Sequence, residues 1–464
     1  MTNPHPYRRV RRLRRDLRLS ATDAVLFSVM VGSGEAYFAA FALAIGLSEV
    51  TAGLVAALPM LTGSLLQLAS PWAVRRLGSI RAWVVGCAMV QALSFGPLLA
   101  GAIAGEMPAW AMFAAVALYW GSGMATGPAW SSWITTIVPA PVRAHYFARR
   151  SRRAQYGVVG GLVGTGVLLQ TQAEALGPIA YAIPFGAAGL ARFLSGLCLA
   201  RQSEPEPEPA EAERADFGAR ARRMWSGPGA RVLTYMLALQ VAVQISGPFF
   251  APYMLRGLDL SYAQFMMLIC AAYAGRVISL PWIGRFAKRF GPANLLWVGA
   301  IGITPLTLMW IVTESFWILL GYQLISGTVW ACYEMATMLL TFETIPASER
   351  TSALTVFNLA NAIAIVIGST IGGAILGVLG ASTDAYHALF AISLVARALA
   401  LPLVGRVKAP PRLRVRVIPL RTIALRPSSG GFDRPVLPGI EEDGPPAAAE
   451  PVSDESLAAG AASR

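Results

Sequence analysis

The sequence predicts an all-α membrane protein with twelve transmembrane helices in two parallel six-helix halves. Of its 464 residues, 55% are hydrophobic and only 14% are charged, against roughly 25% charged in soluble domains. Apolar runs recur at the length of about 20 residues that a ~30 Å bilayer core requires. The net charge of +13 comes from basic residues between these runs, which indicates a membrane surface rather than nucleic acid as partner. A soluble enzyme and a disordered regulator are excluded.

The twelve apolar runs define the expected helices in order. The fourth and tenth runs are unusually long and hold the same place in each half of the chain. The runs cover residues 22–46, 50–73, 83–104, 109–138, 155–175, 178–200, 230–255, 262–284, 293–313, 316–344, 352–379 and 385–405.

Arginine placement predicts the orientation of these helices. Seven arginines precede residue 19, and five more lie between residues 143 and 153, in the connection between the fourth and fifth runs. The alternate connections hold one basic residue, Arg256, among six acidic residues. Because cytoplasmic loops carry the excess of basic residues, both termini are expected to be cytoplasmic, in the inner or plasma membrane of the cell.

Composition divides the chain into five segments. The Glu-Pro repeat at 204–209 marks a hydrophilic linker, and the final segment offers little apolar surface to offset the entropy of ordering. We expect a basic cytoplasmic segment, a six-helix bundle, a cytoplasmic linker, a second bundle and a disordered cytoplasmic tail at residues 1–21, 22–200, 201–229, 230–408 and 409–464.

Short matches between the two halves recur at nearly one offset, which is the mark of an internal repeat. Ser33-Gly34 matches Ser246-Gly247 at 213 residues, and Ala191-Arg192 matches Ala396-Arg397 at 205. Pro71-Trp72 matches Pro281-Trp282 at 210, and Pro139-Ala140 matches Pro346-Ala347 at 207. The halves are therefore expected to be parallel repeats that start on the same side of the membrane.

Six plus six helices, parallel halves and a central linker resemble the major facilitator superfamily over residues 20–408. The family signature Gly-x-x-x-Asp-Arg-x-Gly resembles the stretch from Gly284 to Gly291, where Lys288 replaces the aspartate; the first half keeps only Arg76-Leu77-Gly78. The resemblance implies a substrate cavity between the halves, reached by rocking one bundle against the other. It also implies cytoplasmic gate loops that contain Arg76, Gly78, Gly284, Arg289 and Gly291.

Five ionisable residues lie well inside the apolar runs, where each is a functional hypothesis by default. In the resembling family, spans 1, 4, 7 and 10 line the cavity, so Glu35 and Glu334 become the candidates for proton coupling or substrate binding. The alternative is that each acid only bonds a neighbouring helix. Arg192 and Arg397, on outer spans, are expected to anchor their own bundles. Arg276 suits either an acidic partner or an anionic substrate.

Polar and aromatic residues on the same spans complete the expected cavity. Trp330 and Glu334 are four residues apart and share a helix face, and an acid beside aromatic rings suits a cation. The glutamines either orient a substrate or bond between helices. The expected cavity residues are Tyr37, Tyr119, Trp120, Gln240, Gln244, Gln323, Trp330 and Tyr333.

Glycines four residues apart fill the fifth and eleventh runs, at 157/161, 160/164, 368/372 and 373/377. Such pairs let helix backbones approach closely. They indicate either static packing or a sliding contact between the halves, and the pattern alone does not choose.

The sequence contains no catalytic, nucleotide-binding or metal-binding motif, so we expect neither an enzyme nor a cofactor or metal. Without a nucleotide site, uphill transport must use an ion gradient. We expect a monomeric secondary active transporter that moves a small organic solute by alternating access, with protons and membrane lipid as partners. Proton coupling and export of an amphipathic or cationic compound are the favoured mechanism and direction. An importer of a sugar, peptide or organic acid, or a non-transporting receptor or scaffold, are the alternatives.

Overall fold

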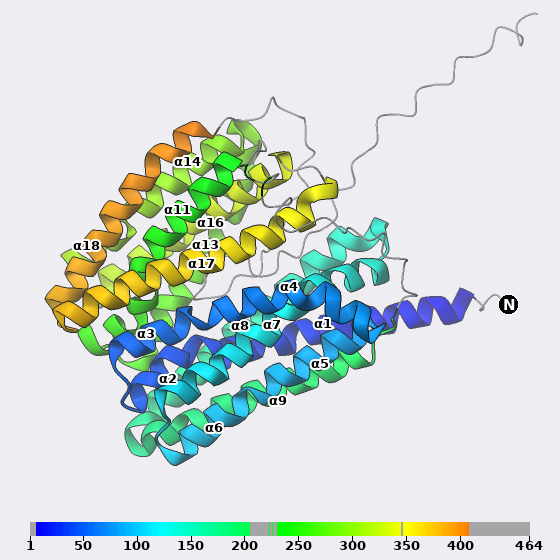
Figure 1. The fold of residues 1–464 in the computed structure, drawn as a ribbon, viewed down its shortest axis with the longest axis horizontal. Coiled ribbons are helices and arrows are strands. Elements are labelled where there is room, and N and C mark those ends of the chain that lie inside the picture. Colours follow the sequence, from blue (N-terminus) through cyan, green and yellow to red (C-terminus); the bar gives the residue numbers. More distant parts are fainter. Residues whose placement is uncertain (1–5, 205–221, 223–224, 226–229, 345–346, 408–464) are drawn as a thin grey trace, which may run out of the picture.

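The computed structural model describes residues 6–204, 222, 225, 230–344 and 347–407, and this part of the chain is helical. Its helices form two bundles that lie side by side, the first in blue to green-cyan and the second in green to orange (Figure 1). The expected tail, 409–464, and most of the expected linker, 201–229, lie outside the described residues.

The first bundle consists of six rods, most of them divided into consecutive helical segments. In chain order the segments are α1 (Pro6–Ser33), η1 (Glu35–Tyr37), α2 (Phe38–Ala44), α3 (Glu49–Ala57), α4 (Pro59–Leu77), α5 (Ile80–Leu93), α6 (Phe95–Ala104), α7 (Ala109–Ile137), α8 (Ala140–Leu176), η2 (Gly177–Tyr181) and α9 (Ala182–Ala200).

The second bundle repeats this arrangement. Its segments are α11 (Ala230–Ser246), η3 (Gly247–Phe249), α12 (Phe250–Pro252), η4 (Tyr253–Gly257), α13 (Tyr262–Phe290), α14 (Pro292–Ile303), η5 (Thr304–Thr307), α15 (Met309–Val312), α16 (Phe316–Thr344), α17 (Ala347–Leu379), α18 (Thr383–Ala400) and η6 (Leu401–Arg406). Helix α1 packs against α8 and α9, as α11 packs against α17 and α18, and α4 pairs with α7 as α13 pairs with α16. The helix pairs that pack together in the first bundle therefore have counterparts in the second, as the internal sequence repeat predicts.

Nine segments of the described part are long and apolar enough to cross a membrane, and one of them, 149–200, includes both α8 and α9. Helices α7 and α16 are not among the nine, although each has 29 residues. The all-helical membrane fold is therefore confirmed, and the count of twelve spans stays a prediction.

Helix α1 begins earlier than the sequence pattern predicts. The first apolar run starts at residue 22, but the helix starts at Pro6 and includes the arginine-rich segment before that run. Arginine is a good helix former, and a proline in the first turn of a helix is tolerated because its missing N–H has no partner there. Hydropathy marks where a helix enters apolar surroundings and not where its hydrogen bonding begins.

Both repeats interrupt their first helix at the same place. Helix α1 gives way to a 3₁₀ turn after Ser33-Gly34, and α11 does so at Ser246-Gly247. The residues after the two glycines differ, since the first turn carries Glu35 and the second carries Pro248. The repeat therefore conserves the break in geometry but not the side chain that the break presents.

The glycine pairs act mainly within each bundle. A Cβ atom on Gly161 would lie 2.7 Å from the Val29 carbonyl oxygen of α1, and one on Gly372 would lie 2.0 Å from the Ile245 carbonyl of α11. Gly164 and Gly377 have open space instead. A Cβ atom on Gly373 would lie 3.4 Å from Leu54 Cδ2 of the other bundle. Packing inside each half is thus the main role of these pairs, with one contact across the halves.

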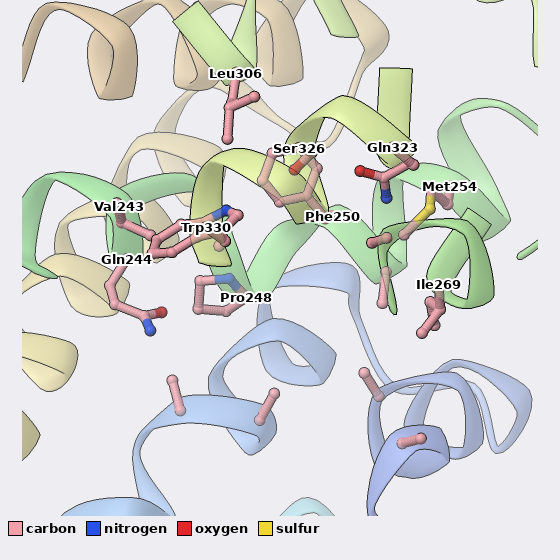
Figure 2. A pocket seen from close by; sticks show the side chains of 18 of the residues that line it. Val243, Gln244, Pro248, Phe250, Met254, Ile269, Leu306, Gln323, Ser326 and Trp330 are labelled. Atoms are coloured by element: carbon pink, nitrogen blue, oxygen red, sulfur yellow. The ribbon is translucent and has the colours of Figure 1, made fainter. Parts of the chain in front are cut away.

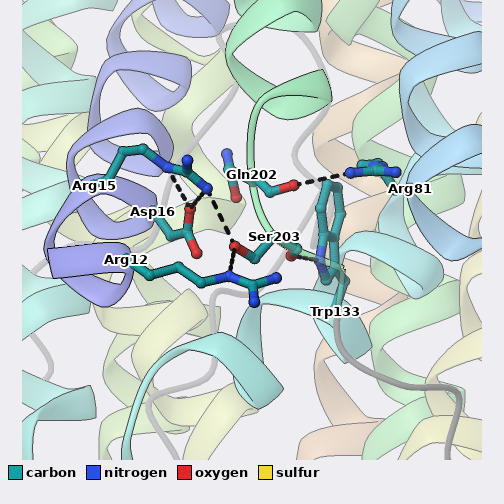
Figure 3. A network of polar contacts seen from close by, with 7 residues as sticks. All are labelled: Arg12, Arg15, Asp16, Arg81, Trp133, Gln202 and Ser203. Atoms are coloured by element: carbon teal, nitrogen blue, oxygen red, sulfur yellow. Dashed lines mark hydrogen bonds and ion pairs between the residues drawn. The ribbon is translucent and has the colours of Figure 1, made fainter. Parts of the chain in front are cut away.

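The chain leaving α9 folds back onto the first bundle. Ser203 accepts a hydrogen bond from the Arg15 guanidinium at 3.3 Å, and its carbonyl accepts one from Trp133 Nε1 at 2.9 Å (Figure 3). Glu204 pairs with Arg81 at 3.6 Å. The first residues of the expected linker are therefore held to the first half.

Hydrogen bonds connect the two bundles at one end, which we call the distal end and define by residues 43–49, 177–181, 256–262 and 380–386. It lies away from the N-terminus of α1 (Figure 1). There Arg256 donates to the Leu43 carbonyl at 2.9 Å, Tyr386 donates to Glu49, and Tyr181 donates to Tyr262 at 2.9 Å. Each bond connects one bundle with the other.

Candidate functional site

A cavity of about 280 Å³ lies between the two bundles. The first bundle contributes residues of η1, α2, α3, α4 and α7, and the second contributes the larger share, including η3, α13, α15 and α16 (Figure 2). Three tryptophans, Trp120, Trp310 and Trp330, line the cavity together with aliphatic side chains and a few polar ones. The charged lining consists of Glu35, Arg276, Glu334 and Arg397.

Glu35 reaches the cavity because α1 breaks beside it. It sits on the 3₁₀ turn η1 and is 5% exposed. The Tyr119 hydroxyl, from α7, donates to Glu35 Oε2 at 2.6 Å. Tyr119 is held in turn by edge-on ring contacts with Phe38 and Phe95, at centroid distances of 5.2 and 5.6 Å. The first bundle therefore presents one buried carboxyl group with an aligned hydroxyl donor.

Glu334 is part of an ion pair within the second bundle. Its Oε1 accepts from Arg276 Nη2 at 2.9 Å, and the two side chains are 8% and 16% exposed. Helices α13 and α16 approach closely enough for this contact because Gly275 and Gly327 face the opposing backbone. The sequence offered an acidic partner or an anionic substrate for Arg276, and the structure supplies the acid.

Arg192 and Arg397 occupy different surroundings despite their repeat relation. Arg192 donates to Gln91 Oε1 and Ser195 Oγ, both at 2.7 Å, inside the first bundle and away from the cavity. Arg397 donates to the Ile303 carbonyl at 3.1 Å and to Ser246 Oγ at 3.2 Å, and it lines the cavity. The anchoring role expected for both arginines fits the hydrogen bonds of Arg397 within its bundle. It does not account for the fact that Arg397 also lines the cavity.

Six of the ten expected coupling and cavity residues line the cavity: Glu35, Trp120, Gln244, Gln323, Trp330 and Glu334. The other four lie behind its wall. Tyr119 supports Glu35, Tyr37 donates to the Leu162 carbonyl at 2.7 Å, and Tyr333 packs on Tyr235 at 6.2 Å. Gln240 is buried on α11, one turn from Gln244. Each of these four residues lies on the same helical segment as a lining residue, and its position along and around that segment separates buried from lining side chains.

Several residues that line the cavity were not among the cavity residues predicted from the sequence. Arg276 and Arg397 were visible as charges in apolar runs, but their spans do not line the cavity in the resembling family. Tyr273 and Phe265 come from the same span as Arg276. Trp310 reaches the cavity on the short helix α15, after the 3₁₀ turn at Thr304–Thr307. Pro305 inside the ninth run is the sequence signal for that break.

The five expected gate-loop residues lie outside the cavity. Arg76 is near the end of α4, and Gly78 ends that helix with φ of +65°. In the second half, Gly284 lies inside α13, Arg289 is near its end, and Gly291 follows with φ of +88°. Positive φ favours glycine, so Gly78 and Gly291 have a clear backbone role in the two turns.

Comparisons with known proteins show which family and which solved structures this chain is similar to. The family model described as Major Facilitator Superfamily matches residues 232–430. No curated protein matches the sequence.

Solved transporter structures match nearly the whole length of the fold. The nucleoside transporter NupG shares 12% identity, covering 85% of this chain and 98% of that one, with a TM-score of 0.60. An inward-facing, unoccupied bacterial homologue of the human lysosomal transporter Spinster shares 18%, covering 88% and 100%, with a TM-score of 0.61. The E. coli fucose:proton symporter FucP shares 13%, covering 85% and 98%, with a TM-score of 0.57. The second half of the chain thus matches the family model of the Major Facilitator Superfamily, and both halves have the fold of these transporter structures.

Proposed function

We propose that this protein is a secondary active transporter that carries a small amphipathic solute by alternating access and couples it to protons. The observation that supports this most is the placement of two carboxyl groups, Glu35 and Glu334, on opposite bundles but around one cavity. An ionisable group buried in a membrane costs several kcal/mol on most scales and is a functional hypothesis by default.

The two acids offer two ways to hold a proton. Ionised Glu334 is held by Arg276, whose attraction is lost when the carboxylate takes up a proton. Glu35 accepts a hydrogen bond from the Tyr119 hydroxyl, which lies on the same bundle. Protonation of either acid therefore changes the charge balance of the cavity, and a solute that favours one protonation state is coupled to the proton.

Alternating access requires that contacts at one end of the bundles break while others form. The distal bonds from Arg256 to Leu43 and from Tyr386 to Glu49 are those that must break for the cavity to open there. If the distal end is external, as arginine placement predicts, the arrangement is closed to the outside. In that orientation both termini are cytoplasmic. Export is the direction of transport that we propose, as in the sequence analysis.

Transport is measured in proteoliposomes with an imposed pH gradient. The radiolabelled probes are phenylacetate, phenethylamine and glucose, which represent an anion, a cation and a neutral sugar. The wild-type protein is expected to accumulate at least one probe against its gradient, and accumulation should stop in Glu35→Gln, Glu334→Gln and the double variant. Glu174→Gln, at an exposed position of α8, is the matched control.

Two outcomes contradict the proposal. Full gradient-driven accumulation in the double variant would leave a uniporter or another coupling ion. If wild-type protein moves none of the three probes in either direction, a non-transporting receptor becomes the better description. The probe exchange rate down its own gradient is measured in parallel, because a variant that only lacks coupling should retain that exchange.

A further inference from the structure

Arg397 is a buried cation on the cavity wall. Its side chain projects from α18, the residue is 3% exposed, and it lines the cavity. A guanidinium group has five N–H donors. Here Nη1 donates to the Ile303 carbonyl and Nη2 to Ser246 Oγ, whereas Nε has no acceptor among the described residues. Both protein acceptors are neutral groups.

No carboxylate in the described part of the chain pairs with this arginine. The ion pairs there join Arg15 to Asp16, Arg81 to Glu204, Arg150 to Asp23 and Arg276 to Glu334. The Ile303 carbonyl ends α14, where the helix dipole favours a cation, so part of the charge is offset. A buried charge without an ionic partner still carries a desolvation cost. The geometry leaves a place for an external anion.

The other residues that line the cavity indicate the chemical character of the solute that carries this anion. Glu334 is occupied by Arg276, and the lining between the charges is largely aromatic and aliphatic. A volume of about 280 Å³ admits only a small solute. Guanidinium groups bind carboxylates through parallel N–H donors and are only weakly hydrated, which suits a buried site.

We propose that Arg397 forms an anion subsite of the cavity and that the transported solute is a small amphipathic carboxylate. This inference rests on the proposed function for one premise, that the cavity is where the solute binds. It revises the preference for a cationic compound that the acids alone suggested.

The test measures binding to the purified full-length protein in detergent by isothermal titration calorimetry. The probes are phenylacetate, indole-3-acetate and hexanoate, each with its matched amide and amine. For wild-type protein we expect at least one carboxylate to bind, at least tenfold more tightly than its amide and its amine. Arg397→Gln should weaken carboxylate binding by about thirtyfold or more and remove the preference over the amide. Arg192→Gln, the repeat-related control away from the cavity, should retain that preference.

A second variant covers the possibility that Arg397→Gln fails to fold. Ser246→Asp places a carboxylate where Ser246 Oγ now accepts from Arg397 at 3.2 Å, so the arginine remains but its charge is satisfied internally. This variant should also lose the preference for carboxylates. A purely structural Arg397 would change the amount of folded protein but not the ratio of acid to amide affinity.

The proposal is overturned if no carboxylate binds the wild-type protein, or if amides or amines bind as tightly as the acids. It is also overturned if the preference survives in both Arg397→Gln and Ser246→Asp, or if Arg192→Gln abolishes it equally. Because binding is measured without a gradient, a failure of proton coupling leaves this result intact. Carboxylate binding without proton-driven transport would contradict the proposed function alone.

Discussion

Arg192 and Arg397 hold corresponding places in the two repeats but have different partners. In the first bundle, Arg192 donates to Ser195, which donates to Asp23 Oδ1 at 2.7 Å, while the other Asp23 oxygen pairs with Arg150 at 3.1 Å. In the second bundle, the position 213 residues after Asp23 is Met236, a buried apolar residue. Within the residues that the structure describes, Arg397 therefore has hydroxyl and carbonyl partners but no acidic one.

The comparison shows that two halves with the same helix packing can use their buried charges differently. The first bundle joins Asp23, Arg150 and Arg192 in one internal network between α1, α8 and α9, and it presents Glu35 to the cavity. The second bundle directs Arg276, Glu334 and Arg397 to the cavity. On this basis we assign structural support mainly to the first set of charges and solute recognition mainly to the second.

The largest effect on stability is expected for Asp23→Asn. The substitution leaves Arg150 buried without its anion, and breaking a buried ion pair from one side costs about 3–5 kcal/mol. The free energy of unfolding is measured by chemical denaturation of the detergent-solubilised protein. The exposed Glu174→Gln control should stay within about 0.5 kcal/mol of wild type. A loss for Asp23→Asn no greater than for this control would remove the distinction between the bundles.

A smaller effect is expected for the ion pair at the cavity. Arg276→Gln and Glu334→Gln should each lower the free energy of unfolding by about 1–3 kcal/mol, because the remaining charge faces a cavity that admits water. The double variant should lose less than the two single variants together, with a coupling of about 0.5–3 kcal/mol. Strictly additive losses would show that the 2.9 Å contact contributes nothing to stability.

The smallest effect is expected for Tyr119→Phe. The substitution removes the hydroxyl that donates to Glu35 at 2.6 Å but keeps the ring contacts with Phe38 and Phe95. A single hydrogen bond contributes about 1 kcal/mol to the free energy of unfolding. The same denaturation measurement checks it, and Tyr37→Phe, which removes a bond to the Leu162 carbonyl, is the matched control. A loss as large as that of Asp23→Asn would place a second structural network in the first bundle.

The sequence by itself determined the helical membrane class, the parallel repeat and the two acids worth testing. Hydropathy and arginine placement act over whole segments, so they need no knowledge of neighbours. The fourth and tenth runs, 109–138 and 316–344, match α7 and α16 to within one residue. The break after Ser33-Gly34 was visible only as a repeated dipeptide, not as the turn that exposes Glu35.

Only the tertiary structure decided which charge meets which. Arg276 and Glu334 are 58 residues apart, and Ser195 and Asp23 are 172 apart, so no local pattern connects them. Depth along a helix also decides whether a side chain lines the cavity, because Gln240 and Gln244 are one turn apart on α11 and the cavity lining includes Gln244 but not Gln240. Arg192 and Arg397 look alike in sequence because the residues that distinguish them, Asp23 and Met236, belong to other helices. Partner choice for a buried charge is set by packing between helices, which sequence periodicity does not encode.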